Sequence, residues 1–480
     1  MRTIVHLVLV TATTALRVVI IGAGVSGLRC SKRLLQSNSI DDVTVLESSN
    51  VVGGRVRTET IEGYQLDIGF AVFLAAYPEA RESLDYEALH LREFVPGAIV
   101  QSESGASLVA DPTRRPSTLL ASLAFPLASL AEKFRLGVLV LSLRLQSIDA
   151  ILASADEEEE CSTLDYLRER LVLSEALIDG FFRPFLEGIY LAPLEQQSPR
   201  LLRFVLKMFA EGAVTLPMGG MGSVAAQLEK GVTDSGGTVR LNSAVDSVSF
   251  GVDGAPHSVQ LASGESLEYD RVIVATTRAE ACRLLAPHAQ RLSPEWLAPG
   301  ADTHRTPLCS ACMYFALNGP PPVREPILVL NGGRSDGGGT SRVVNTICFP
   351  SLVSPSYAPP GQHLASVSLV GPPVADALGD DGALSETARE ALEEAVRSEL
   401  SKWYGADELA SWRHLRTYAL RCAQEGRPPP NRDGFDRSAR VGAGVYACGD
   451  HLATPSLNGA LRSGRVAAEA LLDDLGLDGR

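Results

Sequence analysis

A run of β-branched residues that leads into a glycine-rich turn constrains this chain more than any other feature. Residues 17–21 (RVVII) are typical of a parallel strand buried on both faces. The turn that follows reads Gly22-Ala-Gly24-Val-Ser26-Gly27. Its first glycine permits a tight turn, its second lets the backbone approach a pyrophosphate, and its third lets the next helix pack close to the strand. Because the N-terminus of that helix then faces the phosphates, the pattern predicts a dinucleotide site.

A second strand supplies the acid that such a site needs. Residues 43–47 (VTVLE) end in Glu47, which lies 20 residues beyond Gly27, where a carboxylate accepts hydrogen bonds from a ribose. A glycine-rich turn alone is weak evidence, but here strand, turn, helix, strand and acid occur in register. The predicted fold class is therefore α/β, with a Rossmann-like domain built on a parallel sheet.

A glycine pair and an arginine follow this acid. Gly53-Gly54 would let backbone N–H groups contact a second part of a large cofactor. The guanidinium of Arg55 can form two parallel hydrogen bonds to a phosphate or to a nearby carboxylate. Residues 63–69 (GYQLDIG) then return the chain as a strand and a tight turn. This block resembles the one that follows the dinucleotide fingerprint in FAD-binding flavoproteins of the amine oxidase, phytoene desaturase and protoporphyrinogen oxidase superfamily. The resemblance implies FAD as the cofactor.

The end of the chain carries a second part of the resemblance. Residues 445–450 (VYACGD) read as a strand that ends at a Gly-Asp turn, and residues 455–460 (PSLNGA) precede a helical run. The resemblance implies that the turn contacts the ribityl or pyrophosphate part of FAD. It also implies that the helix presents its first N–H groups to the flavin pyrimidine, where negative charge develops on reduction. The residues that it places at the flavin are Gly449, Asp450, Gly459, Ala460 and Leu461.

The middle of the chain matches as well. Residues 216–222 open a helix, and strands are predicted over 238–250 and 269–277. The resemblance implies that Val245 backs the adenine. Since the superfamily interleaves its domains in sequence, we predict an FAD-binding domain and an α+β substrate-binding domain. The predicted FAD-binding segments are 17–80, 204–277 and 437–476, and the predicted substrate-binding segments are 81–203 and 278–436.

The absence of certain residue types from the sequence narrows the chemistry that the resemblance implies. Amine oxidases of the superfamily hold a water near flavin N5 with a mid-chain lysine, but no lysine occurs between Lys230 and Lys402. They also place an aromatic in the loop before the flavin helix, whereas residues 451–458 (HLATPSLN) contain neither an aromatic nor a cysteine. An amine substrate is therefore disfavoured, and noncovalent FAD is expected. His451 is the catalytic candidate near the flavin, as a proton relay or substrate contact, and its alternative is a packing or cofactor-orienting role.

The expected reaction is dehydrogenation or isomerisation of a hydrophobic, carotenoid-like molecule, with hydride transfer to flavin N5. Residues 181–191 and 203–214 are most similar to phytoene desaturase-like members of the superfamily. Two alternatives stay within the same class, a protoporphyrinogen oxidase-like or an amine oxidase-like flavoenzyme. A third belongs to another class, a non-catalytic FAD-binding protein that serves in assembly or binding.

Charge and hydropathy bear on the partners. The formal net charge is −14, which repels phosphate backbones, so no nucleic-acid binding is expected. Residues 117–145 are rich in leucine with few charges and are interrupted by Pro126. This stretch fits ordinary core helices, a helical hairpin along an apolar tunnel, or a peripheral membrane patch.

Two smaller features complete the interpretation. Cys309 and Cys312 have the spacing of a redox or metal pair, but they lie in an apolar run that reads as a buried strand, and no metal site is expected. Residues 1–16 are apolar after a single arginine and fit a trimmed targeting segment. A plastid or cytoplasmic location is expected.

Overall fold

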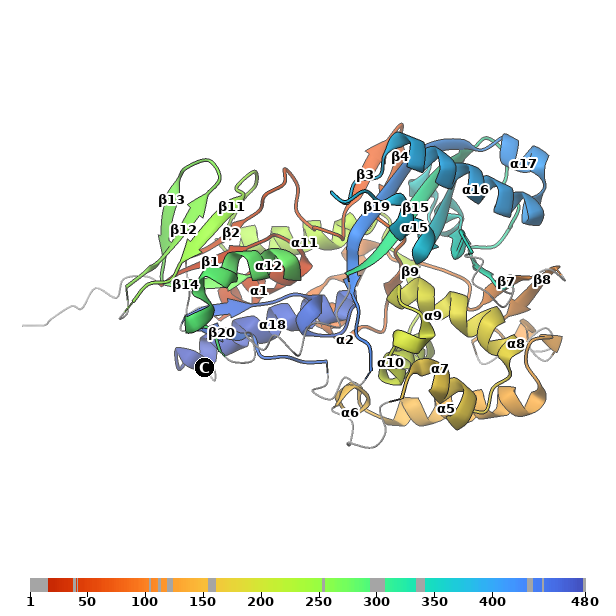
Figure 1. The fold of residues 1–480 in the computed structure, drawn as a ribbon, viewed down its shortest axis with the longest axis horizontal. Helices are drawn as coiled ribbons and strands as arrows, with labels where there is room; N and C mark the ends of the chain where they lie inside the picture. Colours follow the sequence, from red (N-terminus) through yellow and green to blue (C-terminus); the bar gives the residue numbers. More distant parts are fainter. Residues whose placement is uncertain are drawn as a thin grey trace, which may run out of the picture.

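The strand–turn–helix unit lies at the centre of a parallel sheet (Figure 1). β1 (Arg17–Ile21) pairs in parallel with β2 (Asp42–Leu46) on one side and with β14 (Arg271–Val274) on the other. β20 runs antiparallel to β21, and the other pairs are parallel. The strand order is β10 (Thr238–Arg240), β2, β1, β14, β21 (Val445–Ala447), β20 (Arg440–Gly442). The sheet thus takes its strands from the beginning, the middle and the end of the chain.

The computed structural model describes most of the chain. The described residues are 16–37, 40, 42–102, 105–110, 114–118, 124–153, 161–252, 255–293, 307–333, 342–429, 435–442 and 444–477. The predicted targeting segment lies outside this part except for Leu16, and so does a portion of the leucine-rich stretch. The division of the chain into two domains stays a prediction.

The two faces of the six-stranded sheet are covered by different layers, as the alternation of buried side chains along β1 requires. Val18 and Ile20 pack in the cluster that contains the helices, whereas Val19 and Ile21 pack against a small antiparallel sheet and one helix. The helices on the first face are α1 (Val25–Gln36), α11 (Gly222–Asp234) and α18 (Leu457–Asp474). The second face is covered by β11 (Val245–Ser249), β12 (His257–Leu261), β13 (Ser266–Tyr269) and α12 (Arg278–Leu285).

The single strand predicted over residues 238–250 is wrong. The structure divides it into β10, at the edge of the parallel sheet, and β11, in the small antiparallel sheet. Between them Asn242 adopts a positive φ of 52°. The backbone N–H of Ser243 donates to the carbonyl of Glu47 at 2.7 Å. The chain therefore turns around the end of β2 instead of continuing as one strand.

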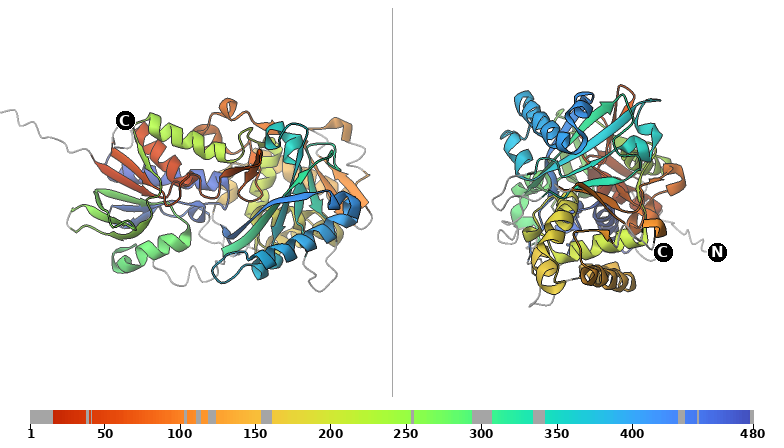
Figure 2. Two further views of the ribbon diagram at one scale, coloured as in Figure 1. Left: turned by 90° about the horizontal axis from the view of Figure 1, so that it is seen from above. Right: turned by 90° about the vertical axis from the view of Figure 1, so that its right-hand side faces the viewer.

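A seven-stranded sheet forms the other half of the molecule, at the opposite end of its long axis (Figure 2). β16 pairs in parallel with β7, and the other pairs are antiparallel. One face packs against α16 (Glu386–Tyr404). The strand order is β19 (Arg413–Glu425), β15 (Pro307–Leu317), β18 (His363–Val370), β17 (Thr346–Cys348), β16 (Leu328–Asn331), β7 (Ala98–Ser102), β8 (Gly105–Val109).

The strand expected around Cys309 and Cys312 is β15. Cys312 is fully buried, and its thiol lies 3.2 Å from the hydroxyl of Ser366. Among the described residues no group of three or more histidine, cysteine or acidic side chains is arranged to hold a metal ion.

A layer of helices lies beside the second sheet (Figure 1). α5 (Leu130–Leu145) begins after Pro126, at a capping box formed by Ser129 and Glu132. It packs against α10 (Pro199–Glu211), where the ammonium of Lys207 donates to the carbonyl of Leu143 at 3.0 Å. Within the described residues no helix is both long and apolar enough to cross a membrane. Shorter helices of this layer are α6 (Ile148–Leu152), α7 (Thr163–Asp165), α8 (Glu175–Leu177) and α9 (Arg183–Tyr190).

The other elements are small. They are a hairpin of β3 and β4, a minor three-stranded sheet and several short helices. The strands are β3 (Thr58–Ile61), β4 (Tyr64–Asp67), β5 (Phe73–Leu74), β6 (Arg92–Glu93) and β9 (Val214–Leu216). The helices are α2 (Pro78–Ser83), α3 (Tyr86–Leu89), α14 (Pro350–Val353), α15 (Pro372–Ala377) and α17 (Ala406–Ala410).

Asp67, at the end of β4, is bonded to β3, to the start of α11, to β15 and to the segment that contains Tyr357. Its carboxylate accepts hydrogen bonds from the hydroxyl of Thr58 at 2.6 Å, the N–H of Met221 at 2.9 Å and the hydroxyl of Tyr357 at 2.9 Å. Its carbonyl accepts a further one from the hydroxyl of Tyr314 at 3.0 Å. Burial raises the pKa of Asp67, and the donors to its carboxylate oppose that shift. The start of α11 is thereby fixed to β4 and to the second sheet.

We predict that Asp67→Ala lowers the free energy of unfolding by about 3 kcal/mol or more, because several buried donors then lose their acceptor. Tyr357→Phe removes one of these bonds and is expected to cost only about 1 kcal/mol. Urea unfolding followed by circular dichroism measures both values. Equal losses in the two variants would contradict the role given to the carboxylate.

Candidate functional site

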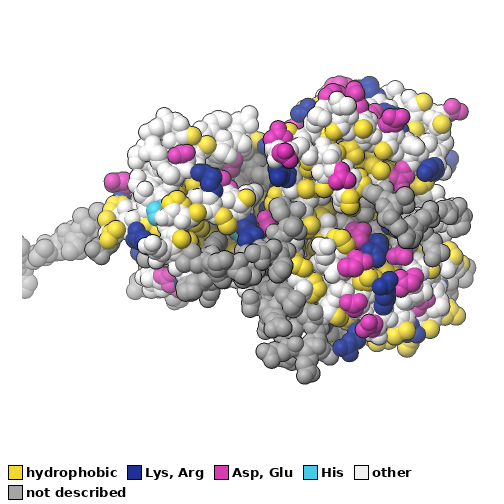
Figure 3. All heavy atoms as spheres, viewed as in Figure 1, with side chains coloured by type: hydrophobic (Ala, Val, Ile, Leu, Met, Phe, Trp, Pro, Cys, Tyr) yellow, Lys and Arg dark blue, Asp and Glu magenta, His cyan; other side chains and the backbone are white. Residues whose placement is uncertain are grey.

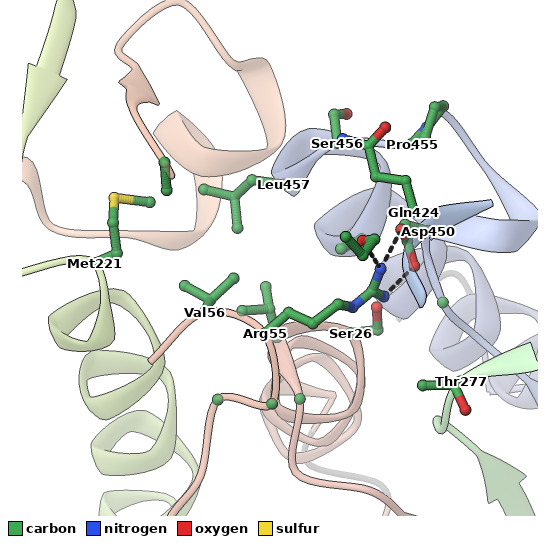
Figure 4. Close-up of a pocket in the computed structure, with 18 of the residues that line it drawn as sticks. Ser26, Arg55, Val56, Met221, Thr277, Gln424, Asp450, Pro455, Ser456 and Leu457 are labelled. Carbon is green, nitrogen blue, oxygen red and sulfur yellow. Dashed lines mark hydrogen bonds and ion pairs between the residues drawn. The ribbon is translucent and has the colours of Figure 1, made fainter. Parts of the chain in front are cut away.

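A cavity of about 660 Å³ begins at the carboxyl ends of β1 and β2 and continues toward α9, α10 and the second sheet. This is the edge of an open parallel sheet at which ligands bind. The lining comes from the glycine-rich turn, the segment around Arg55, the last residues of β19 and the start of α18 (Figure 4). Segments far apart in sequence therefore meet around one space.

The glycine-rich turn forms the floor of the cavity and has no room for side chains at two of its three glycines. Gly22 has a φ of 109°, and a Cβ there would lie 2.7 Å from the carbonyl oxygen of Ala275. A Cβ on Gly27 would lie 2.1 Å from the carbonyl oxygen of Gly22. Gly24 differs, because nothing lies within 4 Å of a Cβ placed on it and it lines the cavity. Its open side is the space in which a pyrophosphate would approach the backbone.

Glu47 ties the turn to the end of β2. Its carboxylate accepts a hydrogen bond from the N–H of Ala23 at 2.8 Å and another from the N–H of Ser49 at 2.9 Å. It is buried and lines the cavity. The same carboxylate therefore shapes the turn and still faces the space where a ribose would lie.

Gly53 and Gly54 bring a second backbone segment against the turn. The N–H of Gly53 donates to the carbonyl of Ala23 at 2.8 Å, and a Cβ on Gly53 would lie 2.3 Å from the carbonyl oxygen of Val56. Gly54 has a φ of 59°, in the left-handed region. Both glycines line the cavity, as the sequence predicts for a cofactor contact.

Arg55 and Asp450 form a bidentate ion pair at the cavity wall (Figure 4). The guanidinium donates to the carboxylate at 2.5 Å and 3.0 Å, and to the carbonyl of Ala423, in β19, at 2.7 Å. Burial opposes ionisation of Asp450, but the charge and the hydrogen bonds of Arg55 hold its pKa below the usual range. Asp450 in turn raises the pKa of Arg55. The sequence left phosphate and carboxylate open as partners of Arg55, and in this structure the partner is a carboxylate.

The start of α18 faces the cavity. Ser456 caps the helix by accepting the N–H of Gly459 at 3.0 Å, and Ser456, Leu457 and Ala460 line the cavity. Gly459 does not line it, but a Cβ there would lie 1.9 Å from the carbonyl oxygen of Thr454. Leu461 is fully buried in the core. Gly459 and Leu461 thus set the path of the helix, and its first turn is the part that meets a ligand.

His451 lies behind the Gly-Asp turn and not on the cavity wall. It is 4% exposed, and a Cβ on Gly449 would lie 2.4 Å from its Nδ1. The buried guanidinium of Arg427 donates to its carbonyl. This position favours the packing or cofactor-orienting role over a direct contact with substrate.

Val245 lines the cavity at its nucleotide end, together with residues that the sequence did not single out. Glu280 and Thr277 reach it from the start of α12, and Gln424 reaches it from the end of β19. The Nε2 of Gln424 donates to the carbonyl of Ile189 at 2.8 Å, while its Oε1 is buried with no hydrogen-bond partner among the described residues. No local motif marks Gln424, because β19 reaches the cavity only through the tertiary fold.

The far end of the cavity is apolar. Among the described residues of the wall, charged side chains lie only at the nucleotide end, where they are Glu47, Arg55, Glu280 and Asp450. The hydroxyl of Tyr190 is already bonded to the carbonyl of Leu201 at 2.8 Å, and that of Thr346 to Asn345 at 2.8 Å. The apolar residues that line this end include Leu74, Phe185, Ile189, Val205, Phe209, Leu328 and Leu330.

We predict opposite outcomes for alanine at two glycines of the turn. Gly24→Ala is expected to leave the apoprotein as stable as the parent, because its Cβ enters open space, and to weaken FAD binding about tenfold or more by filling the place of the pyrophosphate. Gly27→Ala is expected to destabilise the apoprotein itself, because its Cβ meets the Gly22 carbonyl. Thermal unfolding of the apoproteins and fluorescence titration with FAD separate the two effects. Unchanged FAD affinity in a folded Gly24→Ala protein would contradict the assignment.

We also predict that His451 makes the apoprotein sensitive to acid. Burial lowers its pKa to about 4, although Asp450 opposes the shift. The unfolded chain takes up this proton near pH 6.5 and the folded chain does not, so this stabilisation is complete above pH 6.5 and is lost as the pH falls toward 4. The loss amounts to about 3 kcal/mol. Urea unfolding at pH 7.5 and pH 4.5 should show a smaller loss for His451→Gln than for the parent; an equal loss would count against it.

Comparisons with known proteins agree on the fold. A putative protoporphyrinogen oxidase from Exiguobacterium sp. 255-15 superposes with a TM-score of 0.66 at 18% identity, covering 96% of this chain and 99% of that one. Cyclohexylamine oxidase from Brevibacterium oxydans IH-35A gives a TM-score of 0.66 at 16% identity, covering 96% and 100%. At these identities the likeness concerns the fold.

A curated relative matches in sequence over a shorter length. Coproporphyrinogen III oxidase of Bacillus subtilis (strain 168) is 27% identical over 188 residues, which is 38% of this chain and 38% of that protein. The match therefore spans well under two thirds of the relative.

The model of one protein family matches almost the whole chain, over residues 25–472. Its description is flavin containing amine oxidoreductase. The glycine-rich turn, Glu47, the Gly53-Gly54 segment and the start of α18 surround one cavity that suits a dinucleotide cofactor. The chain belongs to the family of flavin-containing amine oxidoreductases and is an FAD-dependent oxidoreductase.

Proposed function

We propose that this FAD-dependent oxidoreductase dehydrogenates an apolar, uncharged molecule. The observation that carries the proposal is the separation of charge along the cavity. Its charged side chains lie at the nucleotide end, and its other end is lined by aliphatic and aromatic groups. A buried apolar wall stabilises apolar surface removed from water and penalises an unpaired charge.

The chain's own residues have three tasks in this reaction. Bound FAD would supply the hydride acceptor at flavin N5. The first turn of α18, with Ser456 and Leu457 on the wall, directs its positive end toward the cavity and so favours negative charge there. The Arg55–Asp450 pair fixes the Gly-Asp turn against β19. The apolar wall excludes water and holds the substrate in place, which lowers the barrier by orientation.

The composition of the wall also separates the candidate substrates. An amine cation would need a carboxylate at the apolar end, and the porphyrinogens would need cationic partners for their carboxylates. The described wall has neither kind of charge there. A carotenoid-like polyene needs no charged partner and remains the proposed example of the substrate class. The similarity to coproporphyrinogen III oxidase favours a tetrapyrrole as the second candidate.

The proposal predicts which compounds reduce the flavin. Under anaerobic conditions, apolar polyenes or other uncharged hydrocarbons are expected to bleach the flavin absorbance of the purified holoenzyme, and coproporphyrinogen, protoporphyrinogen, putrescine and cyclohexylamine are expected to leave it unchanged. Stopped-flow absorbance measures the rates. Bleaching by amines or porphyrinogens alone would reject the apolar substrate while leaving the assignment as a flavoenzyme intact.

A matched pair of variants tests the location of the substrate. Phe209 lines the apolar end, whereas Phe250 packs on the far face of the parallel sheet. Phe209→Leu is expected to change the rate of flavin reduction about tenfold by altering the fit of the substrate. Phe250→Leu is expected to lower stability without changing that rate.

A further inference from the structure

One face of α5 exposes a continuous row of large apolar side chains. The row consists of Leu130, Phe134, Val138, Leu141 and Leu145. These side chains are between 52% and 85% exposed, whereas a globular surface ordinarily exposes such residues singly. In the space-filling view hydrophobic side chains gather along the edge of the molecule formed by this helix (Figure 3). We propose that this row, the α5 stripe, docks on the surface of an anionic lipid bilayer.

The spacing of the stripe matches one helical face. At 100° per residue the five side chains fall within an arc of about 80°, and the stripe is about 22 Å long at 1.5 Å per residue. Leu139 and Leu143 lie on the opposite side of the helix and are buried. The helix is therefore apolar on two sides, and the protein itself covers one of them.

Basic side chains flank the stripe. On the same wheel Lys133 and Arg144 lie beyond one edge of the arc and Arg135 lies beyond the other. The acidic residue of the helix, Glu132, is on the buried side, where it accepts the N–H of Ser174 at 2.7 Å. A helix with an apolar face bordered by cations is the pattern of an interfacial membrane helix, in which the basic groups reach the lipid headgroups.

The basic side chains beside the stripe hydrogen-bond to the backbone in the described part of the chain. Lys133, Arg135 and Arg144 hydrogen-bond to backbone carbonyls, those of Phe125, Leu171 and Val172, and Ala210. On α8, which begins beside α5, the carboxylate of Glu175 is paired with Arg168 at 2.6 Å. The basic helix therefore stands out from a chain whose net charge is −14. Since charge favours one orientation on an anionic surface, the stripe and not another face meets the bilayer.

The buried side of α5 leads to the substrate cavity. Its C-terminal end is bonded to α10, where Arg144 donates to the carbonyl of Ala210 at 3.0 Å and Lys207 donates to the carbonyl of Leu143 at 3.0 Å. The same end of α10 carries Phe209, which lines the apolar half of the cavity. The stripe is thus one helix away from the wall that would receive a molecule dissolved in lipid. A second copy of the chain would cover the stripe without using the flanking cations, because two such helices would bring like charges together.

The docking is measured with the full-length holoenzyme and no substrate, so its failure and that of the proposed function are distinguishable. Flotation with vesicles of phosphatidylglycerol is expected to carry the parent protein at low salt. Binding should fall at least tenfold with phosphatidylcholine vesicles, and at least tenfold in the Phe134→Glu, Leu141→Glu double variant. Val252→Glu changes an exposed valine in the connection between β11 and β12 and is expected to bind as the parent does.

Two further measurements keep the test decisive. Circular dichroism and the flavin content of the double variant are expected to equal those of the parent, because both substituted side chains are exposed. Light scattering gives the oligomeric state of both proteins. A parent that forms a dimer through the stripe, becomes monomeric in the double variant and does not float with either vesicle would overturn the proposal, as would equal flotation of parent and double variant.

Discussion

The ion pair of Arg55 with the buried Asp450 holds together a site made from distant parts of the chain. The two residues are 395 positions apart, and the same guanidinium reaches the carbonyl of Ala423 in a third segment. Such a pair gives up hydration when buried, and its geometry must offset that loss. Two parallel hydrogen bonds and an acceptor on β19 meet this requirement. The pair fixes the Gly-Asp turn against Arg55 and β19. The glycine-rich turn, the start of α18 and the end of β19 therefore hold fixed positions relative to one another.

The sequence predicted the local parts of this site and not the long-range ones. Gly22, Gly27 and Glu47 are recognisable because a tight turn, a close helix and a ribose acid impose residue types at fixed spacing. Gln424 follows no such rule, since its place on the wall depends on where a 13-residue strand ends after its register shifts against β15. The strand predicted over 238–250 failed for a related reason. Both halves have strand propensity, and the need to turn around the end of β2 divides them.

The cavity joins two environments that select for different chemistry. At the nucleotide end, the N–H groups of the glycine-rich turn and a few paired charges lie next to the carboxyl ends of the parallel strands. At the far end, α9, α10, β16 and β17 contribute side chains that have no charge, and the hydroxyls of Tyr190 and Thr346 are hydrogen-bonded within the protein. Residues from the predicted substrate-binding segments would therefore exclude water and fit the substrate, whereas the cofactor would carry the redox step. The absence of a mid-chain lysine agrees with this distribution of tasks, because an apolar substrate does not require it.

The spread of the site along the chain has a consequence for biosynthesis. A nascent polypeptide presents the glycine-rich turn well before Asp450, Ser456 and Leu457, which follow it by more than 400 residues. Until they emerge from the ribosome, Arg55 lacks Asp450 as its partner and the cavity lacks the part of its wall formed by the start of α18. A polypeptide that ends before these residues would therefore present the glycine-rich turn without the Gly-Asp turn and the start of α18 that complete the cavity wall.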